Sequence, residues 1–296
     1  MKFQLFVLII SLSAFAIGKK IVVLYSMGSK SHFYAVKPII EELAQHGHQL
    51  TVFTPFKGIT GNLENINEIV LPAVEQKLEA TFSNVDFFAM DKQTPKQILA
   101  MMFDTIDLIV TACEELITHS EFRRIVQERD VDLFIVDALG NEFNYPIIEQ
   151  LGVPFVIHSS SAAMTTTLEA MGAPVDYASV PTIMSEFDDR MTFFQRIMNI
   201  MSVEMLKPVR NYLIFSKLDA VLQREYPGVR PILEVEGEAS LYITNTHPAT
   251  NWPRSLPPTI LSIGALHVTQ PKPLPQVKKN IVISREFKVT CSASKI

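Results

Sequence analysis

An alternation of short apolar strands with amphipathic helices is the feature that most restricts how this chain can fold. Residues Lys20–Ser26 (KIVVLYS) form an uninterrupted apolar run that predicts a buried strand. Gly28 follows in a loop, and Phe33–Gln45 then has apolar residues at helical spacing. Because Gly47 suits the left-handed position that ends a helix, His48–Thr54 (HQLTVFT) is predicted to be a second strand. Such a unit crosses over right-handed and places its strands parallel.

The rest of the chain repeats this alternation. The further predicted helices are Pro95–Ile117, Glu121–Glu128 and Tyr145–Leu151, and the further predicted strands are Val131–Asp137, Val153–His158 and Ala239–Thr244. Strands that are apolar on both faces are typical of parallel sheets covered by helices on both sides. We therefore expect a doubly wound, Rossmann-like α/β sheet in one large domain over residues 19–275.

Apolar residues also recur at helical spacing between Thr192 and Tyr226, where Pro208 interrupts the pattern. This segment predicts either a pair of helices or one kinked helix. Its methionines and phenylalanines fit core packing better than a binding groove, although Met-rich surfaces do accept varied apolar ligands. After the last predicted strand, a proline-rich stretch is expected to stay extended as far as Ile260–Val268.

The N-terminus has the order of features of a secretory signal peptide. Lys2 precedes the apolar run Leu5–Leu12, and a short segment with alanine and glycine follows as far as Gly18. A transmembrane anchor is the alternative, but an anchor needs about 20 continuous apolar residues. We therefore expect cleavage after Ala16 or Gly18, and a mature chain without a transmembrane helix in the endoplasmic reticulum lumen or secreted.

Composition excludes some classes of protein. With 48% hydrophobic residues, 19% charged residues and a formal net charge of -5, the chain suits a folded domain and not a disordered or nucleic-acid-binding one. Two cysteines, Cys113 and Cys291, are too few for a disulfide-stapled scaffold; we expect free thiols, with pairing left open. The sequence has no Asn-x-Ser/Thr sequon, so N-glycosylation is not expected.

His32 is the first candidate for chemistry, because it lies in the loop between the first strand and the first helix. In open α/β sheets, ligands bind outside the carboxyl ends of the strands, so this ring faces the expected crevice. A histidine, whose unperturbed pKa is about 6.5, can act there as a general base. The competing interpretation is a histidine that only occupies a helix start. Gly28 and Ser29 could let the backbone approach a ligand, although one glycine is a weak signal.

Asp137 ends a predicted strand at the same edge and could orient His32 and stabilise its imidazolium. An N-cap for the following helix explains Asp137 equally well. His158 and Ser159 end another strand and could line a pocket, although helix capping also explains the serine. The sequence contains no metal-ligand cluster, catalytic cysteine motif, Walker loop or Gly-x-Ser-x-Gly elbow.

Several short motifs of the sequence resemble those of a known family. They are Ser31-His32-Phe33, Ile39-Ile40-Glu41-Glu42-Leu43, Gly47-His48-Gln49-Leu50-Thr51-Val52, Val136-Asp137-Ala138, Leu151-Gly152-Val153-Pro154-Phe155-Val156, and Leu256-Pro257-Pro258 with Gly264. In this order they resemble the N-terminal half of animal UDP-glycosyltransferases, the UDP-glucuronosyltransferase-like enzymes. The resemblance extends from Lys19 to about Pro275.

The resemblance implies a GT-B architecture, in which a first Rossmann-like domain binds a small lipophilic acceptor and a second binds the UDP-sugar. It also implies that His32 is the catalytic base, that Asp137 is its partner, and that a hexose is transferred with inversion. Neither a metal nor a resident cofactor is implied, since the UDP-sugar is a co-substrate. The residues expected around the acceptor are Gly28, Ser29, Phe33, His158 and Ser159.

The segment Gln276–Ile296 departs from the family pattern, which continues at this point into a sugar-nucleotide domain. We expect this segment to be a divergent tail that arises from a splice variant, a frameshift or an imperfect gene model. Three functions stay open for such a chain. It is part of a transferase, it is an inactive isoform that binds lipophilic ligands or regulates full-length enzymes, or it is a non-functional fragment.

Overall fold

One parallel sheet organises the described part of the chain. The computed structural model describes residues 18–268, apart from positions 62, 84, 86–92, 183–184, 186, 248 and 253. Its seven strands pair in parallel in the order β3-β2-β1-β4-β5-β6-β7. They are β1 (Lys20–Leu24), β2 (Gln49–Thr54), β3 (Ile66–Val70), β4 (Leu133–Asp137), β5 (Phe155–Ser159), β6 (Leu241–Thr244) and β7 (Ile260–Ser262). The prediction of a doubly wound, Rossmann-like sheet is confirmed, with β1 inside the sheet and β4 beside it.

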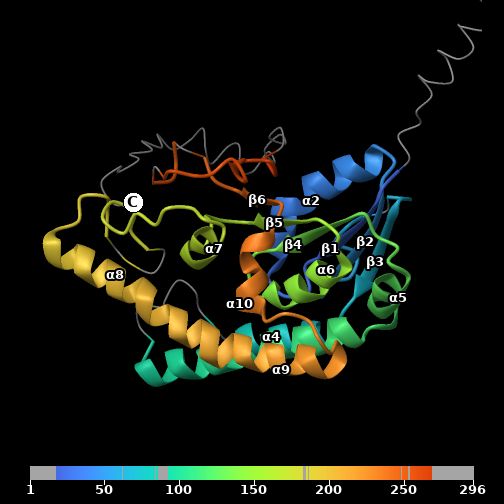
Figure 1. The fold of residues 1–296 in the computed structure, drawn as a ribbon, viewed down its shortest axis with the longest axis horizontal. Coiled ribbons are helices and arrows are strands. Elements are labelled where there is room, and N and C mark those ends of the chain that lie inside the picture. The colour runs from blue at the N-terminus through green and yellow to red at the C-terminus, as the bar shows by residue number, and fades with distance from the viewer. Residues whose placement is uncertain are drawn as a thin grey trace, which may run out of the picture.

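Helices cover both faces of this sheet (Figure 1). On one face, α2 (Lys30–Gln45) packs against Ile21 and Val23 of β1. On the other face, Val22 and Leu24 belong to a larger core. The helices that contribute to this core are α3 (Pro72–Phe82), α4 (Pro95–Thr118), α5 (Ser120–Glu128), α6 (Tyr145–Leu151), α7 (Thr165–Ala170), α9 (Ser216–Glu225) and α10 (Ile232–Val235). Since successive side chains of a strand point to opposite faces, β1 anchors both layers.

The predicted helical segment around Pro208 is one continuous run with an irregular turn. It consists of α8 (Phe193–Pro208), a wider π-helical turn (Val209–Phe215) and α9. The sequence left open whether this would be a pair or a kinked helix. Proline has no N–H, and its ring crowds the carbonyl four residues earlier, so the regular hydrogen-bond ladder is displaced at this point.

Several elements were missing from the sequence predictions, among them β3 and α3. No residue of β3 is fully buried, so its sequence lacks the apolar run that revealed the central strands. In α3 only Val74 is fully buried, so the apolar residues of this helix form a weak helical pattern. The proline at its start is a helix signal, but it is too little to predict the helix alone. The predicted starts of two strands were also early, because β4 begins at Leu133 and β5 at Phe155.

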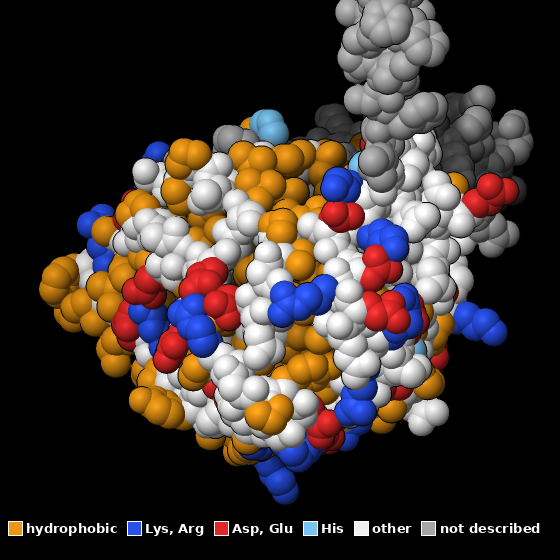
Figure 2. Space-filling model, turned by 45° about the vertical axis from the view of Figure 1, so that its right-hand side comes forward, with side chains coloured by type: hydrophobic (Ala, Val, Ile, Leu, Met, Phe, Trp, Pro, Cys, Tyr) orange, Lys and Arg blue, Asp and Glu red, His pale blue; other side chains and the backbone are white. Residues whose placement is uncertain are grey.

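On the face in Figure 2, acidic and basic side chains alternate in small groups. Within the described ranges, no helix is both long and apolar enough to cross a membrane. Cys113 is a buried free thiol, and burial raises its pKa. Cys291, the tail 276–296 and positions 1–17 of the predicted signal peptide lie outside the described residues.

Candidate active site

The loop after β1 and the end of β4 meet at the carboxyl edge of the sheet, since these two strands are paired neighbours. The first loop turns at Gly28, whose φ of +131° is a conformation that residues with a side chain rarely adopt. A Cβ atom at Gly28 would lie 3.4 Å from Asp137 Oδ2 and 3.5 Å from His32 Nδ1. Glycine therefore lets this loop pass close beside both candidate residues.

His32 and Asp137 form a hydrogen-bonded pair, although 105 positions separate them in the sequence. The distance from His32 Nδ1 to Asp137 Oδ2 is 3.3 Å, and the two side chains are 23% and 1% exposed. The hydrogen bond to Asp137 raises the pKa of His32. Burial raises the pKa of Asp137, and His32 opposes that rise. An ionised Asp137 requires hydrogen on Nδ1, which leaves Nε2 as the acceptor of the ring.

The side chain of Asn141 ties these two loops together, and it is fully buried. Its Oδ1 accepts hydrogen bonds from the backbone N–H groups of Ser26 (3.1 Å) and Met27 (3.2 Å) and from the Ser26 hydroxyl (2.5 Å). Its Nδ2 donates to the carbonyls of Met27 (3.2 Å) and Leu139 (2.9 Å). Sequence reasoning missed Asn141, although an amide shortly after a strand that ends in a candidate carboxylate was an available signal.

A cavity of about 530 Å³, the first cavity, opens beside the His32–Asp137 pair. Its size suits a small-molecule ligand. Gly28, Ser29 and His32 line it, so the structure brings these three predicted residues together. Its apolar lining consists of Met27, Phe56, Leu78, Phe82 and Leu139. A polar, ionisable ring at the edge of an apolar space is suited to remove a proton from a bound lipophilic molecule.

The structure does not place Phe33, His158 or Ser159 in the lining of this first cavity. Phe33 is buried and packs edge-to-face with Tyr25. Burial lowers the pKa of His158 to about 4, so this ring is neutral at neutral pH, and its Nδ1 lies 2.6 Å from the Tyr25 hydroxyl. Ser159 is buried at the end of β5. Contact between these three residues and an acceptor remains a prediction.

A second cavity, of about 330 Å³, adjoins the first, and Leu139 lines both. Its walls include apolar side chains of α4, α8 and the π-helical turn, together with Glu142, Arg210 and Arg254. Arg210 forms an ion pair with the buried Glu236. Burial raises the pKa of Glu142 to about 7. Within the described residues, no group of His, Cys, Asp and Glu side chains could hold a metal ion.

The molecule is thus an α/β protein with a histidine–carboxylate pair beside an apolar cavity, at the carboxyl edge of a parallel sheet, where ligands of such folds bind. The model of the family described as UDP-glucoronosyl and UDP-glucosyl transferase matches residues 20–287. The chain belongs to this family. The resemblance seen in the sequence motifs is thereby confirmed.

Individual relatives are similar over most of this chain. UDP-glycosyltransferase UGT4 of Dactylopius coccus is 26% identical over 275 residues, which cover 88% of this chain and 51% of that protein. UDP-glucuronosyltransferase 2B17 of Homo sapiens is 26% identical over 272 residues, which cover 86% of this chain and 50% of that protein. The chain thus spans about half the length of the relatives that it matches.

Solved structures of glycosyltransferases are also similar, at lower identity. The glycotransferase of kitacinnamycin is 14% identical with a TM-score of 0.45, and the match covers 77% of this chain and 46% of that one. Phytolacca americana UGT2, complexed with UDP-2fluoro-glucose and pterostilbene, is 14% identical with a TM-score of 0.40, and the match covers 78% and 47%.

Proposed function

We propose that this chain binds a small lipophilic acceptor in the first cavity and provides the catalytic base of a UDP-glycosyltransferase. The observation that carries the proposal is the His32–Asp137 pair, with His32 lining that cavity. In the proposed reaction, His32 Nε2 takes the proton of the acceptor hydroxyl. The hydroxyl oxygen bonds to the anomeric carbon as the bond from that carbon to UDP breaks, with inversion. Asp137 stabilises the resulting imidazolium.

General-base catalysis by His32 would supply only part of the rate acceleration of the transfer reaction. General-base catalysis typically contributes about 10²–10⁴-fold. Stabilisation of the charge on the departing diphosphate must contribute much of the remainder. The transfer of a hexose and the inverting outcome are parts of this proposal, which the family resemblance supports.

Acceptor binding is the direct test of this proposal. Titration calorimetry of phenolic and steroid-like acceptors into the purified chain should detect binding. Leu139→Trp, at the boundary of the two cavities, should weaken that binding by about tenfold or more, because the indole occupies the space of the ligand. Leu233→Trp on α10 is a matched control, since Leu233 is exposed and is absent from the lining of either cavity. Undetectable binding, or equal effects of the two variants, would contradict acceptor binding in this cavity.

A second candidate function is binding without transfer, either alone or beside full-length enzymes. Exposed apolar side chains on α8, among them Phe194 and Met205, support this candidate because a partner chain could cover them. Assays of transfer from UDP-glucuronate and UDP-glucose separate the two candidates. Transfer that His32→Ala abolishes supports the enzyme, and acceptor binding without any transfer supports the second candidate.

We also propose that the chain enters the endoplasmic reticulum and resides in its lumen or is secreted. The N-terminal apolar run followed by small residues supports this location. Carbonate extraction of microsomes should release the chain, and N-terminal sequencing should start at Ile17 or Lys19. Retention in the membrane pellet would contradict the proposal.

A further inference from the structure

We propose that the second cavity binds acceptors that carry a carboxylate, with the guanidinium of Arg254 as the counter-ion. This inference rests on the proposed acceptor-binding function and deepens it by naming a class of acceptor. The hydroxyl of such an acceptor would lie at His32 in the first cavity. Its carboxylate would lie in the second cavity, which adjoins the first at Leu139.

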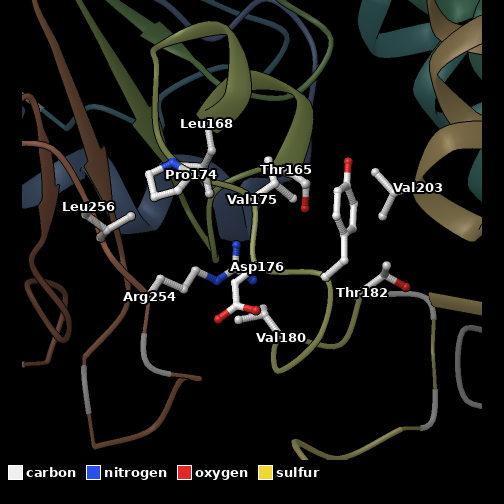
Figure 3. A pocket seen from close by; sticks show the side chains of 11 residues that line it. Thr165, Leu168, Pro174, Val175, Asp176, Val180, Thr182, Val203, Arg254 and Leu256 are labelled. Atoms are coloured by element: carbon white, nitrogen blue, oxygen red, sulfur yellow. The ribbon is translucent and has the colours of Figure 1, made fainter. Parts of the chain in front are cut away.

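Arg254 lines three cavities of the domain. It belongs to the segment between β6 and β7 and lines the second cavity together with two smaller ones. In Figure 3 its side chain extends towards the segment that carries Asp176, within one of the smaller cavities. The second cavity has mainly apolar walls, which include Ile109, Val203 and Phe215. Arg254 is half-buried, so its charge interacts more strongly with a ligand than a fully exposed one, because less water screens it.

The guanidinium of Arg254 has no partner in the described part of the chain. It makes no ion pair or hydrogen bond there, and its Nε atom is buried without a partner. Burial lowers the pKa of Arg254, which reflects the cost of keeping this charge away from water. Arg210 lines the same cavity, yet it is already paired with Glu236. Arg254 is therefore the arginine of this cavity that is available for an anionic ligand.

Two acidic side chains near Arg254 do not neutralise it. Asp176 lines a smaller cavity with Arg254, but its carboxylate accepts hydrogen bonds from the backbone N–H (3.2 Å) and the hydroxyl of Ser179. Glu142 lines the second cavity, but with a pKa of about 7 it is partly protonated at neutral pH. One unpaired guanidinium among apolar walls suits a single carboxylate, which it can bind through two parallel hydrogen bonds. A diphosphate carries more charge and would require more cations.

The test compares two hydroxylated probes that differ in charge, 6-hydroxy-2-naphthoate and 6-hydroxy-2-naphthamide. Titration calorimetry with the purified chain at neutral pH and low salt should show about tenfold tighter binding of the naphthoate. Arg254→Met keeps the length of the apolar stem and should abolish that preference. Arg254→Lys keeps the charge without the bidentate geometry and should retain part of it. Arg224→Met changes an exposed arginine of α9 and should leave the preference unchanged.

Added salt provides a measurement that needs no variant, because screening should reduce the naphthoate preference of the wild-type chain. Equal affinity of the two probes in the wild type, or an undiminished preference in Arg254→Met, overturns the inference and leaves the proposed function standing. If neither probe binds, both proposals fail. UDP-glucuronate is titrated in parallel. If Arg254→Met abolishes its binding while the probe preference persists, the guanidinium serves the donor and the inference is overturned.

Discussion

At the scale of single residues, the proton affinity of His32 depends on Asp137. The pKa of His32 is raised because Asp137 accepts its hydrogen bond. Folding therefore favours the protonated ring, and the stability that the pair contributes is fully present below the unfolded pKa. It is lost as the pH rises through the higher, folded pKa. A general base must be neutral, so the fraction of chains ready to take a proton increases over this same rise in pH.

Asp137→Asn tests this coupling, because it removes the carboxylate with little change in size. The pKa of His32, measured by NMR titration of its ring protons, should fall, because the hydrogen bond to the Asp137 carboxylate that raises it is lost. Burial, which lowers the pKa of His32, would then act without the opposing carboxylate. An unchanged curve for His32 would show that Asp137 does not set its proton affinity.

Among the polar side chains of the site loops, Asn141 is expected to contribute most to the free energy of unfolding. Asn141→Ala leaves the buried N–H groups of Ser26 and Met27 without their acceptor. Each such group costs about 1–3 kcal/mol, so the free energy of unfolding in urea should fall by about 3 kcal/mol. Asn65→Ala, which removes one 3.1 Å bond to the Ala44 carbonyl, is the control and should cost about 1 kcal/mol. Equal losses would contradict a special role for Asn141.

The residues of the site differ in how far the sequence could reveal them. His32 and Asp137 were found because each follows an apolar strand, and the carboxyl ends of parallel strands share an edge. Asn141 and the proposed role of Arg254 were missed because both depend on which loops lie side by side and on which charges lack partners. Phe33, the residue after His32 in a motif of the family resemblance, was expected near the acceptor, and that contact remains a prediction. The helix turns its ring into the core against Tyr25, which adjacency in sequence does not reveal.

At the scale of elements, the central strands were predictable and the peripheral ones were not. β1 and β4 are covered by helices on both faces, and an uninterrupted apolar run is the consequence. β3 is a partly exposed edge strand, so polar residues interrupt its pattern. Pro208 predicted an irregularity, but the course of the chain beyond it also depends on contacts distant in sequence, since α9 packs against α4 and the π-helical turn packs against α10. Local sequence therefore predicts the break and not its geometry.

The ion pair between Arg210 and Glu236 joins the π-helical turn to the segment that follows α10. Glu236 is 1% exposed and also accepts a 2.9 Å hydrogen bond from Thr167. Glu236→Ala leaves the charge of Arg210 buried without its partner, which should lower the free energy of unfolding by about 3–5 kcal/mol. Glu234→Ala breaks the exposed 3.5 Å pair with Arg230 and should cost less than about 1 kcal/mol. Chemical denaturation measures both; similar costs would contradict the anchoring role of Glu236.

At the scale of the whole molecule, one face of α8 leaves large apolar side chains uncovered. Phe194 is 77% exposed and Met205 is 67% exposed. In Figure 1, α8 extends away from the sheet, above the first turns of α4. Those turns carry further exposed apolar residues, namely Ile98, Leu99 and Phe103. Uncovered apolar surface of this kind promotes association, so the isolated chain is expected to self-associate and to bind hydrophobic dyes.

The double substitution Phe194→Glu and Met205→Glu tests whether this face is the source of that behaviour. The two positions lie on one side of α8, nearly opposite Val203 of the second cavity, because a helix turns by about 100° per residue. Dye fluorescence and the sedimentation coefficient should therefore fall while acceptor binding persists. The free energy of unfolding should change by about 1 kcal/mol or less, since exposed sites contribute little. Leu233→Glu, at an exposed leucine of α10, should change neither signal. If it lowers both as much as the double variant does, self-association does not arise from α8.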